Sequence, residues 1–178
     1  MRNKIAYTVM SVSVIFICVV VLLLVWLLPL LTATNNTLST ATEFALDHTP
    51  LQHVEDSQIY TGDPSDVTVT GTDSLGRTLY VFVRHHEATI VYQDQTVSES
   101  RAIDAVHALH LPIASIVSVI PGLIDKNLDT PLSNKASGNA VWQVTARLAD
   151  GGFLFAYVDM YTGKLFYDFQ TNHIPQVE

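Results

Sequence analysis

Cysteine is nearly absent from this 178-residue sequence, since Cys18 is the only one. A single cysteine forms no disulfide within the chain and builds no cysteine-type zinc site. Bases are scarce too, because residues 32–178 hold seven Lys and Arg against 17 Asp and Glu. So acidic a chain repels phosphates, and we therefore expect neither nucleic-acid binding nor attraction to anionic lipid headgroups.

Acids are missing from the first 42 residues, and residues 1–31 carry only two bases, Arg2 and Lys4. The 18 uncharged residues from Val14 to Leu31 are long and apolar enough to span a bilayer. The positive-inside rule then predicts a cytoplasmic N-terminus over residues 1–4 and a transmembrane anchor over residues 5–31. The chain is thus expected to be a single-pass protein of the cell membrane, extracytoplasmic after Leu31.

A cleaved signal peptide is the competing interpretation of this segment. Its apolar region runs about 7–15 residues and ends at a small-x-small site. Here the run is longer, and the sequence from Leu31 to Thr34 (LTAT) fits such a site poorly. We therefore favour an uncleaved anchor, followed by a polar, uncharged tether over residues 32–39.

The rest of the chain shows a weak internal duplication. Each copy contains a capped helix stopped by a proline, then a strand, a hairpin and a last strand. The two helices are predicted over Thr40–His48, capped by Ser39, and Glu99–His110, capped by Ser98. The same order of elements occurring twice predicts a first unit over residues 40–95, a second over 96–172, and a C-terminal tail over 173–178.

Side-chain patterns indicate how each unit is layered. Trp142, Val144, Ala146 and Leu148 share one face of a strand, and Gln143, Thr145 and Arg147 share the other, which predicts a half-buried antiparallel strand. An amphipathic helix across such a sheet is an α+β arrangement. Units this small are marginal alone, so we expect them to dock, with Tyr80, Phe82, Phe155 and Tyr157 near the shared surface.

Catalytic patterns are weak throughout. His107 and His110 lie three apart on a predicted helix, but His85 and His86 point to opposite sides of a strand end, and no zinc or calcium motif is present. Neither common serine-nucleophile motif occurs. Glu55 and Asp56 are strand neighbours that should face opposite ways. We therefore expect no catalytic residues, no cofactor and no bound metal, with a hydrolase built on the four histidines as the remaining enzymatic alternative.

Two segments stand out as candidate partner surfaces. Asp159, Tyr161, Thr162, Gly163 and Lys164 form a predicted turn in which Asp159 caps backbone amides and Gly163 takes a left-handed conformation. Pro121, Gly122 and Leu123 end a strand beside the loop Ile124–Asn139, where Leu123 and Ile124 are expected to be exposed. Each segment is either a structural feature alone or a place where a partner binds.

Several of these segments resemble the TseB-like (YpmB-like) cell-wall elongation regulators of Gram-positive bacteria. The resemblance spans residues 37–170 and is strongest in the second unit. It rests on Ser98-x-x-x-Ala102-x-x-Ala105, Ser118-Val-Ile-Pro-Gly-Leu123, Val141-Trp-Gln-Val144, Tyr157-Val-Asp159, Tyr161-Thr-Gly-Lys164, Ile59-Tyr60-Thr-Gly62, and Gly76 with Val81-Phe82-Val83. The chain departs from the family pattern in its longer Ile124–Asn139 loop, in Arg101 and in His85-His86.

The resemblance implies a membrane anchor followed by two PepSY/cystatin-like domains. It also implies a non-enzymatic role, in which the protein binds penicillin-binding proteins and regulates peptidoglycan synthesis during cell-wall elongation. A PepSY-like inhibitor or sensor of an extracytoplasmic peptidase would share the same fold, and stays open as the alternative.

Overall fold

The computed structural model describes residues 19–23, 36–62 and 65–172. The chain divides into two units, residues 1–39 and residues 40–178. In the first unit, residues 19–23 and 36–39 are helical. The predicted anchor over residues 5–31 otherwise lies outside the described residues, as does the predicted tail over 173–178. Within the described ranges, no helix is both long enough and apolar enough to cross a membrane.

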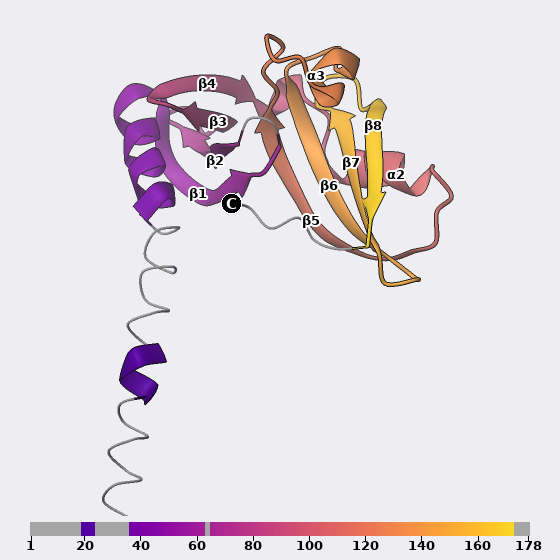
Figure 1. Ribbon diagram of the computed structural model, residues 1–178. Coiled ribbons are helices and arrows are strands. Elements are labelled where there is room, and N and C mark those ends of the chain that lie inside the picture. Colours follow the sequence, from indigo (N-terminus) through magenta and orange to yellow (C-terminus); the bar gives the residue numbers. More distant parts are fainter. Residues whose placement is uncertain (1–18, 24–35, 63–64, 173–178) are drawn as a thin grey trace, which may run out of the picture. The chain divides into compact units, whose positions relative to one another are not determined.

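The second unit is an α+β structure with two four-stranded antiparallel sheets (Figure 1). Both sheets have their strands in chain order, so the predicted repetition of strand, hairpin and strand is confirmed. The strands of the first sheet are β1 (Leu51–Tyr60), β2 (Asp66–Asp73), β3 (Thr78–Arg84) and β4 (Glu87–Tyr92), and those of the second are β5 (Ile113–Leu123), β6 (Ala140–Leu148), β7 (Phe153–Asp159) and β8 (Leu165–Thr171). The helical elements are residues 36–48, η1 (Gln93–Gln95), α2 (Glu99–His107) and α3 (Pro131–Lys135).

Helix boundaries match the sequence prediction at one cap and differ elsewhere. Ser98 is the N-cap of α2, and its side chain accepts a hydrogen bond from the Arg101 N–H, as predicted. The same helix ends at His107 rather than at His110, whose φ of 56° no longer belongs to a right-handed helix. Ser39 lies inside a helix that already includes residue 36, so its predicted capping role is wrong.

Tight turns connect β2 with β3 and β3 with β4. The predicted loop from Asp73 to Gly76 is present, with Gly76 at a φ of 75° and its N–H donating to the Asp73 carbonyl. The turn between β3 and β4 was not predicted. It consists of His85 and His86, which both have positive φ, as the favoured two-residue hairpin turn requires.

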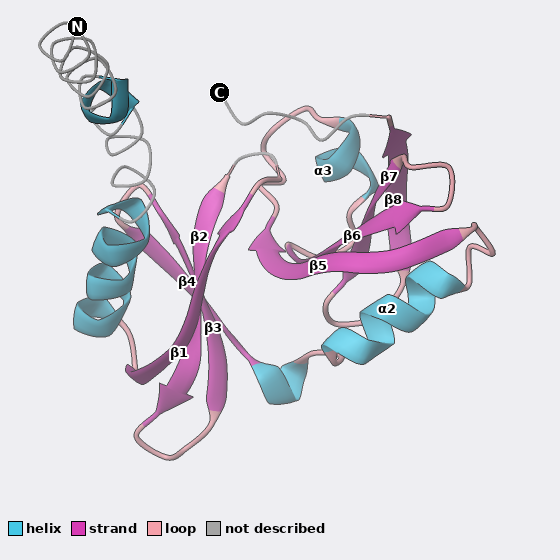
Figure 2. Ribbon diagram, turned by 90° about the horizontal axis from the view of Figure 1, so that it is seen from below, coloured by secondary structure: helices cyan, strands magenta, loops and turns pink. Residues whose placement is uncertain are grey.

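Each sheet has a helix against one face (Figure 2). Helical residues 40–48 lie along the first sheet and bury Ala41 and Ala45. On the second sheet, Ala102 and Val106 of α2 pack into a core with alternate residues of β6 and β7. Trp142 belongs to this core and is 3% exposed, which confirms its predicted burial.

The other face of the second sheet is also buried, which corrects the prediction of a half-buried strand. Gln143 and Thr145 are both buried, although Arg147 is exposed. Leu132 of α3, Tyr60 of β1 and the aromatic residues of β7 form a second core on this face. Local alternation could not reveal this cover, because it comes from the Ile124–Asn139 loop and from the first sheet.

The two sheets dock as expected, through some of the predicted aromatic residues. Tyr80 and Phe82 point away from the helical side of the first sheet and join the core shared with Trp142. Phe155 instead stacks on Phe169 of its own sheet, with ring centroids 5.1 Å apart. Tyr157 belongs to the same core as Tyr60 of the first sheet, so it lies at the junction.

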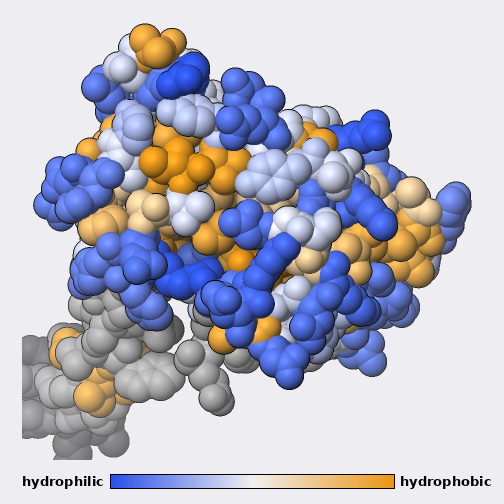
Figure 3. All heavy atoms as spheres, turned by 90° about the horizontal axis from the view of Figure 1, so that it is seen from above, coloured by the Kyte–Doolittle hydropathy of each residue, from blue (hydrophilic) through white to orange (hydrophobic). Residues whose placement is uncertain are grey.

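Exposed apolar side chains of the second unit are dispersed over separate elements. The large ones are Leu46, Leu75, Val117, Leu128 and Tyr161. On the face drawn in Figure 3, apolar groups likewise alternate with hydrophilic ones. Apolar exposure alone therefore does not mark a binding site.

Candidate functional site

The predicted segment from Pro121 to Leu123 lies in the junction between the two sheets. Pro121 and Gly122 are buried and Leu123 is half-buried. A Cβ on Gly122 would come within 2.1 Å of the Tyr60 ring, so only glycine lets this ring pack here. Ile124 is 2% exposed, so its predicted exposure is wrong. These residues hold the sheets together, and their surfaces face the interior.

The predicted turn from Asp159 to Lys164 is present, with Gly163 at a φ of 70°. Asp159 is buried, and its carboxylate accepts hydrogen bonds from the N–H groups of Gly138, Tyr161 and Thr162 and from the hydroxyls of Ser137 and Thr162. Burial favours its protonated form, but these hydrogen bonds outweigh burial and lower the pKa of Asp159. Tyr161, Thr162 and Lys164 are exposed, and that they contact a partner stays a prediction.

The two predicted segments lie in one row across the second sheet. Gly122 is paired with Val141, and Val141 is paired with Asp159 on its other side. They are thus two strand spacings apart, about 10 Å. Val141, which lies between them, is buried. The two segments are therefore connected through the interior of the second sheet.

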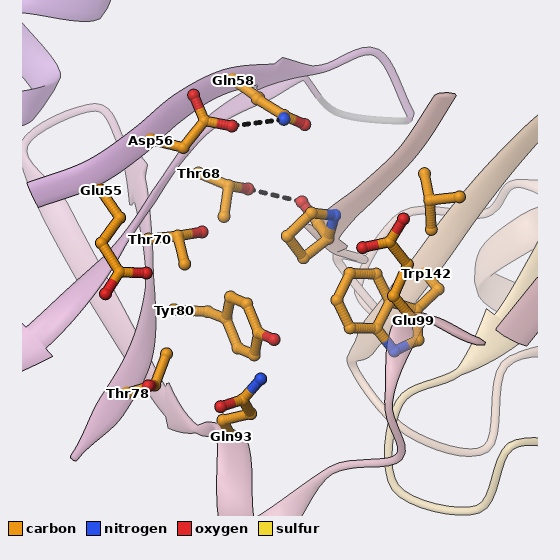
Figure 4. A pocket seen from close by; sticks show the side chains of 12 residues that line it. Glu55, Asp56, Gln58, Thr68, Thr70, Thr78, Tyr80, Gln93, Glu99 and Trp142 are labelled. Atoms are coloured by element: carbon orange, nitrogen blue, oxygen red, sulfur yellow. Dashed lines mark hydrogen bonds between the residues drawn. The ribbon is translucent and has the colours of Figure 1, made fainter. Parts of the chain in front are cut away.

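A different feature, a cleft of about 290 Å³, opens between the first sheet, the start of α2 and the edge of the second sheet (Figure 4). We call it the inter-sheet cleft. Its lining is rich in hydroxyl, amide and carboxylate groups and includes two aromatic rings. The lining residues are Glu55, Asp56, Gln58, Thr68, Thr70, Thr78, Tyr80, Gln93, Glu99, Val119, Pro121 and Trp142.

Two aromatic rings join the sheets at the inner side of this cleft. Tyr80 of β3 meets Trp142 of β6 edge to face, with ring centroids 5.5 Å apart. The indole Nε1–H of Trp142 donates to the Val97 carbonyl, which holds the ring in place. In Figure 4, Tyr80 points from the first sheet toward Trp142. This pair forms a rigid, amphipathic wall.

The cleft is negatively charged, because its lining includes three carboxylates and no Lys, Arg or His. Two of them, Glu55 and Asp56, are neighbours on β1, and both line the cleft because the strand register shifts between Val54 and Asp56. Such a bulge changes where side chains point, so the prediction that this pair faces opposite ways is wrong. Glu99 comes from the first turn of α2.

Burial and charge act together on the Tyr80 hydroxyl. Burial is the largest cause of its raised pKa, and the negative Glu99 and Glu55 raise it further, against a hydrogen bond with Gln93. The hydroxyl is therefore a neutral hydrogen-bonding group at physiological pH. With nearby amide and hydroxyl groups, it suits a polar or cationic ligand.

A buried ion pair closes the junction beside the cleft. Arg84 Nη2 donates to the Asp66 carboxylate at 3.1 Å and to the Leu123 carbonyl at 2.9 Å. The Asp66 side chain is fully buried. Burial raises the pKa of Asp66 to about 7, although Arg84 and a backbone hydrogen bond with Leu123 oppose this. We call this group the Asp66–Arg84 latch.

Neither the inter-sheet cleft nor the latch was predicted from the sequence. Asp66 and Arg84 lie at the paired ends of two strands, and only the docked second sheet desolvates them. One feature of the sequence could have indicated the latch: Asp66 directly precedes the alternating strand residues 67–70. An acid that becomes buried at such a place needs a partner, because an unpaired buried charge is costly.

Metal-binding geometry is not found in the part of the chain that the structure describes. No group of three or more His, Cys, Asp or Glu side chains there could hold a metal ion. His107 ends α2, whereas His110 lies in a left-handed turn beyond it, and His85 and His86 form a hairpin turn. The structure thus gives no support to the histidine-based hydrolase.

Three comparisons relate the chain to known proteins. A family model described as the cell wall elongation regulator TseB-like domain matches residues 40–84. A Bacillus subtilis protein named as a probable cell wall elongation regulator, TseB, is 30% identical over 125 residues, which are 68% of this chain and 69% of that protein. The solved structure of the YpmB protein from Bacillus subtilis has a similar fold, with a TM-score of 0.59, 24% identity, and coverage of 75% of this chain and 96% of that one.

Proposed function

The chain belongs to the family of TseB-like cell wall elongation regulators, and we propose that it acts as a membrane-anchored, non-enzymatic module that binds a penicillin-binding protein outside the cytoplasm. The family supports a regulatory role in cell-wall elongation. To this family role our proposal adds three points: the class of the partner, the membrane anchor and the absence of enzymatic activity.

One observation carries the proposal of a binding role. The 30% identical relative is a regulator by name, and this chain has a cleft with hydrogen-bonding groups and an acidic rim. In the described residues, no group of three or more His, Cys, Asp or Glu at this rim could hold a metal ion. Such a lining suits the recognition of a ligand through hydrogen bonds and charge.

The apolar segment over residues 5–31 supports anchoring, since it alone has the length and composition of a span. An anchored module works within reach of the membrane, where the enzymes that polymerise peptidoglycan also lie. Topology can be tested with the full chain in intact cells. A Leu75→Cys variant should react with a membrane-impermeant maleimide, because Leu75 is 76% exposed. Protection of this cysteine until the cells are lysed would contradict an extracytoplasmic module.

The partner can be identified by photocrosslinking in cells. A photoreactive amino acid placed at Glu55 on the rim of the cleft, or at Tyr161 on the exposed turn, should trap a penicillin-binding protein identifiable by mass spectrometry. Leu46, on the helix of the first sheet, is a control position of similar exposure to Tyr161. Capture of a membrane peptidase instead would favour the inhibitor alternative, and failure to capture a wall-synthesis enzyme from either site would contradict the proposal.

A further inference from the structure

The strand β5 lies at the edge of the second sheet and borders the inter-sheet cleft. In an antiparallel pair, the N–H and C=O groups of alternate residues point away from the neighbouring strand. The Pro121 carbonyl points outward, because it accepts a hydrogen bond from the Thr68 hydroxyl of the first sheet. Ile124 points inward, since its N–H donates to the Asn139 carbonyl. The outward-facing residues of this stretch are therefore Val119, Pro121 and Leu123.

The first sheet covers only the C-terminal end of this edge. Thr68 engages Pro121, and the Asp66–Arg84 latch engages Leu123. Pro121 itself has no N–H to satisfy. Val119 is a lining residue of the cleft, and among the described residues no hydrogen bond engages its outward N–H and C=O. The covered end and the open end meet at the cleft.

The open part of the edge lacks two of the usual protections against strand pairing, charge and proline. Residues 113–120 contain neither a charge nor a proline, and Val117 is 54% exposed. Natural edge strands are commonly blocked by Lys, by Pro or by a covering segment. This edge has two register shifts, between Ile113 and Ser115 and between Ile116 and Ser118, but from Ser118 on its pairing with β6 is regular.

Charge decides which kind of strand would fit. The rim residues Glu55, Asp56 and Glu99 provide three carboxylates close to the open edge. A buried acceptor, Gln58 Oε1, also has no hydrogen-bond partner among the described residues and belongs to the cleft lining. An ammonium or guanidinium group would satisfy this oxygen and neutralise the rim. A strand without a cation would leave the negative charge of the rim uncompensated.

We propose that β5 accepts an extended, basic segment of the partner as an added strand, and that a Lys or Arg side chain of that segment enters the inter-sheet cleft. Main-chain hydrogen bonds to Val119 provide the register, and the acidic rim provides the preference for a cation. This inference rests on the proposed function only for the identity of the partner, because the edge and the cleft are features of this chain.

Binding can be measured directly with a defined probe. The probe is the blocked heptapeptide Thr-Val-Thr-Lys-Thr-Val-Thr, titrated against the full chain in detergent micelles by NMR. We expect it to bind roughly tenfold tighter than the same peptide with Glu at its centre, and the difference to shrink at high salt. Equal binding of both peptides, or no binding of either, would overturn the proposal.

Two sets of variants separate the edge from the cleft. Val119→Pro removes the outward N–H at a position equivalent to Pro121, so the strand should tolerate it, whereas Val119→Thr keeps the N–H. We expect at least a tenfold loss of binding for V119P only, with both variants retaining the wild-type amide spectrum elsewhere. Glu55→Gln with Glu99→Gln should remove the lysine preference, whereas Glu43→Gln with Glu87→Gln, which lie outside the cleft lining, should not. If V119P fails to fold, the proposal is still tested by the Glu55→Gln, Glu99→Gln variant, which should lose the preference for the Lys peptide over the Glu peptide.

Crosslinking from Val117 in cells separates this inference from the proposed function. Capture of a basic segment of a wall-synthesis enzyme at Val117, and not at the exposed control Leu75, would support both. Peptide binding with the expected preferences, but with a different protein captured, would support the edge and contradict the proposed partner. Capture of a wall-synthesis enzyme at another site, without peptide binding, would support the proposed partner and contradict the role of the edge. A crosslinked dimer of this chain through Val117 would show that a second copy occupies the edge and would overturn the inference.

Discussion

Replacing Asp66 with Asn should remove a specific pH dependence from the stability of this protein. The Asp66 side chain is fully buried where the first sheet meets Leu123 of the second, and its partner Arg84 is only 18% exposed. Asparagine has the same shape and keeps a carbonyl acceptor for Arg84, but it does not titrate. The substitution therefore tests the ionisation of Asp66 rather than the packing of the junction.

The sign follows from the two pKa values of Asp66. Burial raises its pKa to about 7 in the folded chain, against the ordinary value of 3.8. Between these values the folded state holds a proton that the unfolded state has lost, so this group's stabilisation is greatest below pH 3.8 and is lost as the pH rises to about 7. From pH 5 to pH 7 the two units correspond to about 3 kcal/mol, because one unit is worth about 1.4 kcal/mol.

Urea unfolding at pH 5 and at pH 8 measures this effect. The comparison uses the difference between wild type and Asp66→Asn, so that pH effects common to both proteins cancel. We expect wild type to gain about 3 kcal/mol more than the variant on going from pH 8 to pH 5. A matched control is Asp125→Asn, which neutralises the half-buried carboxylate 3.8 Å from Arg84 and should leave the pH difference in place. The same pH response in wild type and Asp66→Asn would refute the reasoning.

Three further substitutions test other parts of the structure. Asp159→Ala should lower the free energy of unfolding at pH 7 by about 2–4 kcal/mol, because it leaves several buried donors without an acceptor. Since the pKa of Asp159 is lowered on folding, wild type should itself lose stability as the pH falls below 3.8, and no such loss in urea titrations would contradict this. Gly122→Ala should cost about 1–3 kcal/mol through its clash with Tyr60, and the double variant with Tyr60→Leu should recover part of the loss; additive losses would argue against the clash. His85→Asn should raise the free energy of unfolding by about 0.5 kcal/mol, because asparagine tolerates the positive φ of this turn better than histidine. The melting temperature should rise slightly, and a lower melting temperature would count against that account.

Features that depend on neighbours in sequence were predictable. Ser98 caps α2 because its side chain bonds an N–H three residues later, and the loop from Asp73 to Gly76 closes on its own backbone. The alternation in β6 likewise identified the face that carries Trp142. The turn at His85 escaped notice because histidine at two positive-φ positions is unusual, although the strands on either side of it demand a tight connection.

Features that depend on the second sheet meeting the first could not be predicted in this way. Gln143 reads as solvent-facing by alternation, yet it is buried and its Nε2 donates to the Thr61 hydroxyl from the first sheet. Glu55 and Asp56 read as opposite-facing until a bulge in β1 turns both toward the cleft. A pattern along one strand contains no information on a register shift or on a partner 80 residues away.

The amino-acid sequence by itself therefore determined the cap of α2, the loop from Asp73 to Gly76, the duplicated order of elements, the acidic charge and the membership of a regulator family through its motifs. Those properties arise from hydrogen bonds and side-chain periodicity within short stretches of chain. The tertiary structure alone decided that Pro121, Gly122 and Asp159 are buried supports and that the open edge of β5 meets an acidic cleft. Burial and local charge arise from which surfaces come together, and docking of the two sheets is what removes water from one end of β5 and leaves the other end open.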